Sequence, residues 1–585
     1  MTFPQLYVLI VVILLVISLY REWLNPALSF FLALVALLTA GIINPEEALK
    51  GLANQQIIVI FLLMLITAGL RSIFGGELFS KYFSHTLTPR GFLLRMMVTV
   101  SSVSAFLNNT PIVAFMIPYV KEWADKNNQS ASRFLIPLSF ATITGGMITV
   151  IGTSTNLVLS GLLSEFDQPP LAYTDFVFLG LIVTVITWAY MYFIGFRLLP
   201  SNTPKKDIQQ NLKEYIVETV VFGGSPLIGK SVRDANLRNL KDLFLVEIIR
   251  NDRVISPVSP DEVLHEGDFL FFSGNTQSIY NLIKEDNGLQ IPKEERLAHQ
   301  GEFKFTEAVI PANSDLIGMR IKDSDFRRRY NASIVALHRD GKRVSGKVGE
   351  MSLSGGDFLL LLAGDDTGVQ VGEKNLFTIS RPMPLEKKRK GYLLWIGLAS
   401  LIMLVIGILG VLPLFTCCVF VLLCLIVFGI LNLPEIRRQL DLNLLVILVS
   451  SLAIGVALVN SGAAALIAGG IVGLVSKWGV MAEIAVLFVV TTLLTALITN
   501  AAAVSIMFPI AMSLAAMTNA PPTAFYIAIA FAASGDFMTP IGYQTNLMVY
   551  GPGGYTFKDF LRVGSPLTLI YMIVCIVFIS YYYKL

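Results

Sequence analysis

Long apolar runs in both halves of this 585-residue chain limit its fold more than any other feature of the sequence. The chain opens with TFPQLYVLIVVILLVISLY, and similar runs cover 26–44, 55–70, 173–199, 391–431 and 563–583. They are of the order of the roughly 20 apolar residues that a bilayer-crossing helix needs. Because the first run lacks the basic segment and the small-residue cleavage site of a signal peptide, we expect it to remain as a helix. The sequence therefore predicts an α-helical polytopic membrane protein.

Composition agrees with this reading and excludes other classes. Hydrophobic residues make up 54% of the chain and charged residues 15%, whereas ordinary soluble domains have about 45–50% and about 25%. A net charge of +3 gives no reason to expect a nucleic-acid partner. All cysteines lie inside apolar runs, which favours packing over a disulfide or zinc site: Cys417, Cys418, Cys424 and Cys575. The histidines are scattered outside these runs, so we do not expect an enzyme: His85, His265, His299 and His338.

A polar insert separates the two apolar halves. From about 201 to 390 the pattern is one of short alternating strands and charged turns, and a basic run at 386–390 closes it. SPLIGKSVRDANLR (225–238) aligns without gaps on SDLIGMRIKDSDFR (314–327), and LHEGDFLFF (264–272) aligns on LSGGDFLLL (353–361). We therefore expect an N-terminal membrane repeat over 1–200, insert units over 201–298 and 299–385, and a C-terminal membrane repeat over 386–585.

One stretch of the insert, GSPLIGKS from Gly224 to Ser231, fits the phosphate-loop pattern G-x-x-x-x-G-K-S. The second copy has Met319 and Arg320 where the first has Lys230 and Ser231, so the repeated feature is S-x-L-I-G. Each copy is also too short for the sheet that carries a phosphate loop, and no apolar run ends in a partner aspartate. We do not expect nucleotide hydrolysis.

The two copies resemble the TrkA-C domain, the C-terminal regulatory module of potassium-conductance regulators. The resemblance rests on L-I-G, on an amphipathic strand (LFLVEIIR and ASIVALHR) and on the later L-x-x-G-D-F-L. It implies a pair of α+β domains that supports a homodimer and binds a small regulatory ligand. A rigid cytoplasmic spacer without a ligand is the alternative, because a shared fold does not establish a site.

The membrane halves also repeat each other. SAFLNNTPIVAFMIP (104–118) aligns on TALITNAAAVSIMFP (495–509), and GGMITVIGTSTNLVLSG (145–161) aligns on GDFMTPIGYQTNLMVYG (535–551). Amides, hydroxyls and a proline are unsuited to plain spanning helices, and non-helical backbone at that depth has to line a protein-enclosed cavity. We therefore predict two inverted repeats, with re-entrant hairpins within 91–120 and 461–516 and broken helices within 133–163 and 522–550. The alternative is that the polar side chains only join helices through hydrogen bonds.

The distribution of basic residues predicts the orientation in a cell (inner) membrane. With five crossings per half, the insert lies on the opposite side from both termini. Most basic residues then share the side of the insert: Arg21, Arg71, Lys81, Arg90, Lys121, Lys126, Arg133, Arg197, Lys205, Arg437, Arg438, Lys558 and Arg562. The other side keeps chiefly Lys50, Lys477 and Lys584. The positive-inside rule places the insert in the cytoplasm and both termini outside.

With these motifs the membrane halves resemble the divalent-anion/sodium symporter family. TPIGYQTNLMVYGPGGY (539–555) and the paired inserts resemble the branch that includes sulfate permeases of bacteria and algae. The resemblance implies a symporter that works by alternating access, with sodium as the coupling ion and no other cofactor. It implies one sodium site at Ser104, Asn108, Asn109 and the backbone of Gly152, and another at Thr495, Thr499, Asn500 and the backbone near Gly542. Amide, hydroxyl and freed carbonyl oxygens are ligands that suit sodium.

The same resemblance places the anion between the two hairpin tips. It implies substrate contacts from Asn109, Thr110, Thr155, Asn156, Asn500, Thr545 and Asn546, helped by helix N-termini. Where the family has S-N-T twice, this chain has Asn108-Asn109-Thr110 and Thr499-Asn500-Ala501, so one of the two anion-facing hydroxyls is missing. A lopsided site favours one compact tetrahedral dianion, sulfate, over a dicarboxylate, which remains the alternative substrate.

Asp536, which aligns with Gly146, is the one carboxylate that we place inside the broken helices. Because an ionisable group there is a functional candidate by default, it is a possible coupling carboxylate. It is a candidate to strengthen the second cation site, to carry a proton, or to cap a half-helix. An ion channel gated by the TrkA-C modules is the rival function. A channel needs a filter such as T-V-G-Y-G repeated with pore symmetry, and Ile541-Gly542-Tyr543 lacks that context.

Overall fold

The fold is seen in a computed structural model of the chain. It describes residues 1–585 except 22, 75–86, 202–215, 238–239, 241–242, 252, 256–257, 275–287, 291–304, 312–313, 331, 340–341, 345–347, 364–375, 379–391, 409, 434–435, 437–441, 519 and 541. The basic run at 386–390 and the predicted boundaries at 298/299 and 385/386 lie outside the described residues. So do Lys81, His85, Lys205, His299, Arg437, Arg438 and Ile541.

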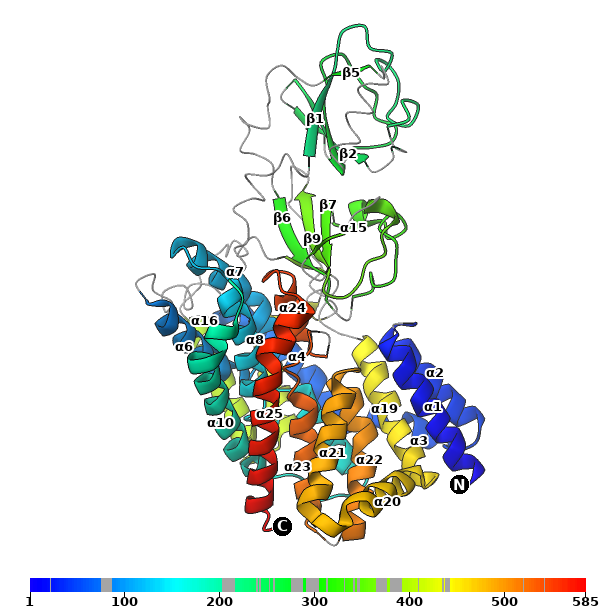
Figure 1. Ribbon diagram of the computed structural model, residues 1–585, viewed down its shortest axis with the longest axis vertical. Coiled ribbons are helices and arrows are strands. Elements are labelled where there is room, and N and C mark those ends of the chain that lie inside the picture. The colour runs from blue at the N-terminus through cyan, green and yellow to red at the C-terminus, as the bar shows by residue number, and fades with distance from the viewer. Residues whose placement is uncertain are drawn as a thin grey trace.

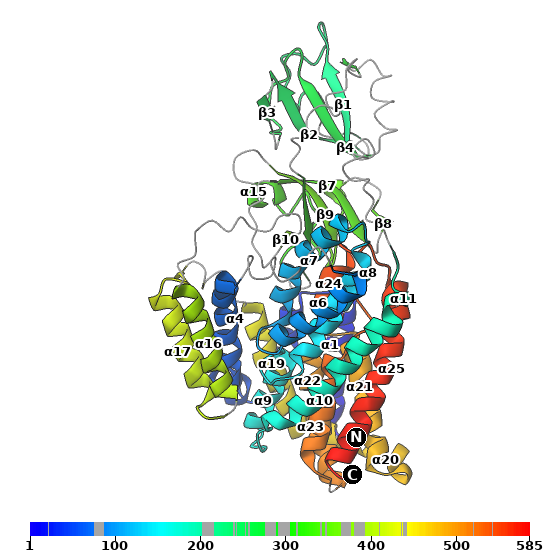
Figure 2. The same cartoon turned by 90° about the vertical axis from the view of Figure 1, so that its left-hand side faces the viewer.

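Helices make up both membrane halves. The first half contains α1 (Phe3–Tyr20), α2 (Pro26–Thr39), α3 (Pro45–Leu49), α4 (Gln55–Phe74), α6 (Pro89–Ser104), α7 (Asn109–Lys126), α8 (Ser132–Gly146), α9 (Ser154–Glu165), α10 (Tyr173–Tyr190) and α11 (Phe196–Leu198). The second half contains α16 (Tyr392–Ile408), α17 (Leu414–Val427), α19 (Leu442–Asn460), α20 (Ala463–Val475), α21 (Val480–Thr495), α22 (Asn500–Thr518), α23 (Pro522–Ser534), α24 (Gln544–Tyr550) and α25 (Phe557–Tyr582). The predicted apolar run at 391–431 therefore holds two helices, which pack beside α4 at one edge (Figure 2).

Several of these helices suit a bilayer by length and by surface. Among the described residues, six helical stretches are long and apolar enough to span a membrane: Phe3–Tyr20, Pro45–Leu70, Tyr173–Leu198, Leu442–Asn460, Asn500–Thr518 and Phe557–Tyr582. Large apolar side chains such as Phe193, Ile402 and Ile573 face outward, as expected where lipid replaces water. The chain is thus mainly helical, with the apolar helices of a polytopic membrane protein.

The most buried helices lead into the breaks. α8 and α23 are buried on nearly every side, which is typical of a helix at the centre of a bundle. α8 ends at Gly146 and the helix resumes only at Ser154, while α23 ends at Ser534 and helix resumes at Gln544. Shorter breaks separate α6 from α7 at 105–108 and α21 from α22 at 496–499. The helix ends therefore coincide with the polar motifs that recur in both halves.

The insert forms two antiparallel sheets with the same topology. The first contains β1 (Ile216–Val221), β2 (Leu243–Arg250), β3 (Arg253–Ile255), β4 (Phe269–Gly274) and β5 (Leu289–Gln290) in the order β3-β2-β4-β1-β5. The second contains β6 (Phe305–Val309), β7 (Ala332–Arg339), β8 (Lys342–Arg343), β9 (Phe358–Ala363) and β10 (Phe377–Thr378), in the order β8-β7-β9-β6-β10. Short α15 (Phe326–Tyr330) precedes β7.

Matched contacts stabilise both sheets. Arg250 Nε donates to Asp268 at 2.8 Å in the first, and Arg339 Nε donates to Asp357 at 2.7 Å in the second. The hydrogen bond to Asp268 raises the pKa of Arg250 above its usual value, so this pair keeps its charges. In the stretch that resembles a phosphate loop, Gly229 has φ +81°, and the described residues 230–237 contain no helix of the kind a phosphate loop needs.

The second sheet rests on the helices, and the first lies beyond it (Figure 1). Lys121 of α7 forms an ion pair with Glu307 of β6, and Phe358 belongs to the same apolar cluster as the membrane helices. A Cβ atom on Gly356 would lie 2.4 Å from Leu547 Cδ1 of α24, so sheet and helix are in close contact there. Both chain ends lie at the end of the helical region farthest from the sheets (Figures 1 and 2).

Candidate functional site

The first oxygen-rich cluster forms where α6 ends and α7 begins. Ser104 Oγ donates to the Thr142 carbonyl at 2.8 Å and contacts the Asn109 amide. Hydrogen bonding favours the amide orientation in which Asn109 Nδ2 faces Ser104 Oγ and the carbonyls of Thr142 and Gly152, at 2.5, 3.3 and 3.3 Å. Three oxygens from three segments therefore converge on one side chain.

Gly152 brings further carbonyl oxygens to the same place. A Cβ atom there would lie 2.5 Å from the Gly146 carbonyl oxygen and 2.8 Å from that of Ser104, so only glycine fits. The helix break leaves these carbonyls without the partners that a continuous helix would supply. Freed carbonyl, hydroxyl and amide oxygens are what a small hard cation prefers in transporters with broken helices.

A second cluster repeats this pattern in the other half. Thr495 Oγ1 contacts Asn500 Oδ1 at 3.0 Å and donates to the Ala533 carbonyl at 2.9 Å, as Ser104 does with Asn109 and Thr142. A Cβ atom on Gly542 would lie 2.9 Å from the Thr495 carbonyl oxygen. The structure thus brings each predicted sodium-binding group together in its own cluster. These clusters are Ser104–Asn109–Gly152 and Thr495–Asn500–Gly542.

A Thr-Asn pair at each break, Thr155-Asn156 and Thr545-Asn546, takes part in hydrogen bonds that stabilise the non-helical backbone. Asn156 Nδ2 donates to the Thr149 carbonyl at 3.0 Å, and Asn546 Nδ2 donates to the carbonyls of Asp536 and Thr539 at 2.9 and 3.0 Å. Ser139 Oγ, on α8, contacts Thr545 Oγ1 at 2.8 Å and donates to Asn546 Oδ1 at 2.7 Å. Thr155, Asn156, Thr545 and Asn546, predicted as substrate ligands, are all buried in this scaffold.

Tyr543 and Gln544, which the sequence analysis did not predict as site residues, connect the two halves of the chain. The Tyr543 hydroxyl lies 2.6 Å from the Asn109 amide and 3.4 Å from Thr153 Oγ1. The Thr110 hydroxyl donates to Gln544 Oε1 at 3.1 Å. Thr153 and Tyr543 occupy the N-cap positions of α9 and α24 without a side-chain capping bond. Thr153 and Tyr543 occupy the same position in the aligned repeats. The replacement of a small polar residue by a large one at that position was the sequence feature that could have identified Tyr543.

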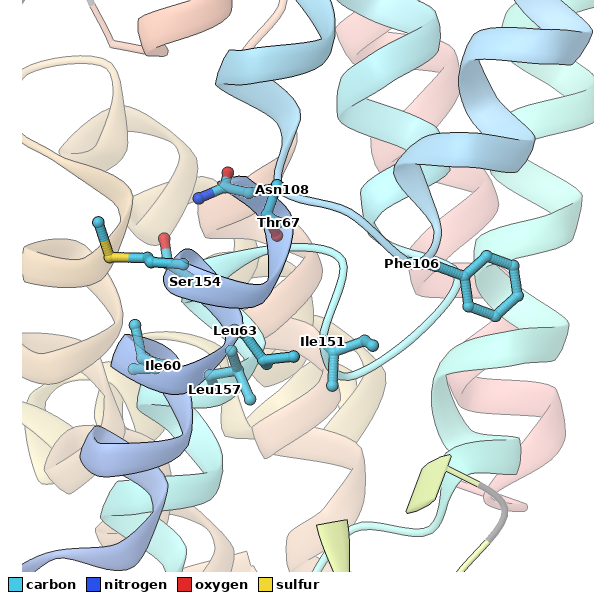
Figure 3. A pocket seen from close by; sticks show the side chains of 9 residues that line it. Ile60, Leu63, Thr67, Phe106, Asn108, Ile151, Ser154 and Leu157 are labelled. Carbon is cyan, nitrogen blue, oxygen red and sulfur yellow. The ribbon is translucent and has the colours of Figure 1, made fainter. Parts of the chain in front are cut away.

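The remaining predicted tip residues lie apart from the two clusters. Asn108, the N-cap residue of α7, makes no side-chain capping bond and instead lines a small pocket. Thr67 of α4 and Ser154 of α9 lie in the same pocket (Figure 3). The other lining residues are Ile60, Leu63, Met64, Phe106, Ile151 and Leu157. In the second half, exposed Thr499 accepts a long 3.4 Å bond from the Ala502 amide at the start of α22.

Charged ligands are sparse at this site. Among the described residues, no group of three His, Cys, Asp or Glu side chains is placed to hold a metal ion. Asp536 is the carboxylate that approaches a cluster, and its Oδ2 lies 1.8 Å from the position that a Gly542 Cβ would occupy. Apart from this carboxylate, both clusters are built from neutral oxygen and nitrogen groups.

Comparison with known proteins places the chain among transporters. The family model described as citrate transporter matches residues 7–504 and 405–585. A Chlamydomonas reinhardtii protein named for a regulatory role in sulfur deprivation is 34% identical over 96% of this chain and 99% of its own. An uncharacterized transporter of Synechocystis sp. is 32% identical over 96% of this chain and 94% of its own. Sodium/sulfate cotransporter 1 of Chlamydomonas reinhardtii is 23% identical over 94% and 87%.

Proposed function

This chain belongs to the citrate transporter family, a family of anion transporters, and we propose that it is a sodium-coupled secondary transporter of sulfate. It moves a small divalent anion by alternating access and performs no enzymatic chemistry. The names of related sodium/sulfate cotransporters support this substrate and this coupling ion. The family description favours a second candidate, a sodium-coupled carrier of a carboxylate anion.

The observation that carries the proposal is the duplicated oxygen cluster. In each half a hydroxyl residue ends one helix, an asparagine five positions later begins the next, and a glycine of the facing break closes the group. Two copies of one arrangement built from neutral oxygens suit two sodium ions. Ser104, Asn109 and Gly152 hold the first ion, for which the Asn109 amide turns its oxygen toward Ser104 and Gly152. Thr495, Asn500 and Gly542 hold the second. Asn108 and Thr499 each precede the cluster asparagine and lie apart from the clusters.

The anion binds between the tips, where neutral donors and helix ends face it. α7, α9 and α22 begin at Asn109, Ser154 and Asn500, and their unpaired N–H groups and dipoles favour a negative charge. Thr110 and Tyr543 add hydroxyl donors on the first side. Ala501 adds none on the second, and Gln544 narrows the space beside Thr110. The resulting site favours a compact tetrahedral dianion.

The proposal includes the sequence-based expectations for the repeats, the insert and the orientation in the membrane. The two halves act as inverted repeats, and the sheets at 201–298 and 299–385 form a cytoplasmic pair of TrkA-C domains that supports a homodimer and a regulatory ligand. Both termini lie outside the cell, on the side opposite the insert. Their position at the far end of the helical region is compatible with this topology (Figure 1).

Uptake by purified protein in proteoliposomes tests the proposal. Labelled sulfate should accumulate when an inward sodium gradient is imposed at clamped pH and voltage, and it should not when potassium or choline replaces sodium. Parallel vesicles receive labelled citrate and succinate. Sodium-driven uptake of a carboxylate without sulfate would favour the second candidate. Sulfate uptake that is equal in sodium-free buffer would overturn the coupling.

A further inference from the structure

The two cation clusters differ in one charged group. Asp536 lies in the second break at the position that aligns with Gly146 of the first. Its side chain is only 2% exposed. A carboxylate removed from water requires hydrogen bonds and a compensating positive charge, so the groups around Asp536 determine its role.

Hydrogen bonds satisfy the carboxylate only in part. Thr539 donates to it twice, from Oγ1 at 2.8 Å and from the backbone amide at 3.3 Å. The Met538 amide is a further hydrogen-bonding neighbour. All of these donors are neutral, and among the described residues no lysine, arginine or histidine forms an ion pair with Asp536. Within the described part of the chain, the negative charge therefore has no partner of opposite sign.

One oxygen of the carboxylate, which also accepts from Thr539 Oγ1, faces the second oxygen cluster. Asp536 Oδ2 occupies the space beside Gly542 where a Cβ atom would stand, and the Thr495 carbonyl oxygen adjoins the same space. Two neutral tyrosines complete the surroundings. Tyr571 packs on Gly535 and donates to the Phe531 carbonyl at 2.6 Å, and Tyr543 follows Gly542 directly. The charge thus points toward the oxygens that we assign to sodium.

The first half has no room for such a group. A Cβ atom on Gly146 would lie 2.6 Å from the end of the Asn109 amide and 3.0 Å from the Gly152 carbonyl oxygen. The first cluster is consequently built from neutral oxygens alone. The asymmetry belongs to the architecture of the two breaks, not to a chance orientation of one side chain.

We propose that Asp536 is a direct ligand of the second cation site and makes that site anionic, so that it binds one alkali cation more tightly than the neutral first site does. This inference rests on the proposed sodium coupling and assigns unequal roles to the two ions. The second site fills at lower sodium concentration, because a carboxylate attracts a cation by full charge and a carbonyl only by its dipole. The first site then determines the sodium concentration at which transport begins.

An isosteric variant separates this role from helix capping. Asp536→Asn keeps an oxygen that accepts from Thr539 and removes the charge. Asp559→Asn is the matched control, since Asp559 accepts from Thr556 N at 2.7 Å and Thr556 Oγ1 at 2.8 Å at the start of α25, outside both clusters. Full-length protein in detergent is titrated with sodium chloride against choline chloride at constant ionic strength, and thermal unfolding is recorded.

In Asp536→Asn we expect the sodium concentration that gives half of the thermal stabilisation to rise at least about tenfold, while Asp559→Asn behaves as wild type. Binding of radioactive sodium to the wild type supplies a second readout, which does not depend on a variant folding. Two classes of site that differ by about tenfold or more in affinity support the assignment.

Other results overturn the inference in distinguishable ways. If Asp536→Asn and wild type need the same sodium concentration, or if the wild type has one class of site, the anionic site is wrong while sodium-coupled uptake stands. If the wild type shows neither sodium-dependent uptake nor stabilisation by sodium, both this inference and the proposed function fail.

Discussion

The Tyr543 hydroxyl lies 2.6 Å from the Asn109 amide, so a side chain of the second half reaches the start of α7 in the first. Both residues are buried. The amide oxygen of Asn109 accepts this hydroxyl when its nitrogen faces the oxygen cluster. In this orientation the amide nitrogen faces the first oxygen cluster, so Asn109 has to turn its oxygen toward the cluster before it can contact a cation there.

Removing the Tyr543 hydroxyl should weaken anion binding without abolishing it. In Tyr543→Phe the Asn109 amide loses one neutral hydrogen bond, worth about 0.5–1.5 kcal/mol, so the apparent affinity for the anion should fall about two- to tenfold. The measurement is the concentration dependence of labelled sulfate uptake. Tyr7→Phe, which removes a hydroxyl bonded to the Ala36 carbonyl, is the control. Equal half-saturation in both variants would show that Tyr543 does not shape the site.

Transport should require both tip asparagines. Asn109→Ala and Asn500→Ala each remove an amide from an oxygen cluster, and no neighbouring side chain supplies a replacement in that half. We expect sodium-driven uptake to fall to the level of empty vesicles. Asn25→Ala, which removes the capping bond to the Ala27 amide at the start of α2, should keep uptake. Retained sodium dependence in both tip variants would exclude the clusters as the cation sites.

Adding the missing hydroxyl should change selectivity. Ala501→Thr restores a hydroxyl next to Asn500, which should favour a dicarboxylate by one hydrogen bond, or about two- to tenfold in the ratio of succinate to sulfate uptake. The two labelled anions are compared in the same vesicle preparation. An unchanged ratio would contradict the role that we give to the asymmetry of the tips.

Transport should not depend on Lys230. The segment 224–231 forms turns in the first sheet unit, and Met319 occupies the matching position in the second copy. Lys230→Met should therefore leave uptake unchanged in vesicles without nucleotide. Wild-type protein that is inactive there and recovers only with hydrolysable ATP would establish the phosphate-loop interpretation that we reject.

The breaks were predictable because their chemistry is local. Amides, hydroxyls and glycines at 104–110 and 145–156 are unsuited to continuous membrane helix, and their recurrence at 495–500 and 535–546 marks a shared structure. Helix ends at Ser104, Gly146, Thr495 and Ser534 fall where those motifs begin. That Ser104, Asn109 and Thr495 are cation ligands was implied by the family resemblance, and it stays a prediction.

Contacts across the fold were not predictable in this way. Asn109 and Tyr543 are 434 positions apart, and neither residue carries a local sign of the other. The opposite problem arises at Asn156 and Asn546, whose polar side chains look like substrate ligands in the sequence. In the structure both side chains donate to backbone carbonyls of their own breaks. Which polar groups are used internally depends on packing that a motif does not encode.

The second sheet contacts the middle of the short helix α24. Leu547 meets Gly356 of the sheet, and the helix begins at Gln544, directly after Tyr543. At the matching glycine of the first sheet, Gly267, a Cβ atom would have no neighbour within 4 Å among the described residues. If the second sheet tilts, either the contact between Gly356 and Leu547 opens or α24 moves with the sheet. If the helix shifts, Tyr543 and its contact with Asn109 shift with it, so a movement of the second sheet reaches the first oxygen cluster.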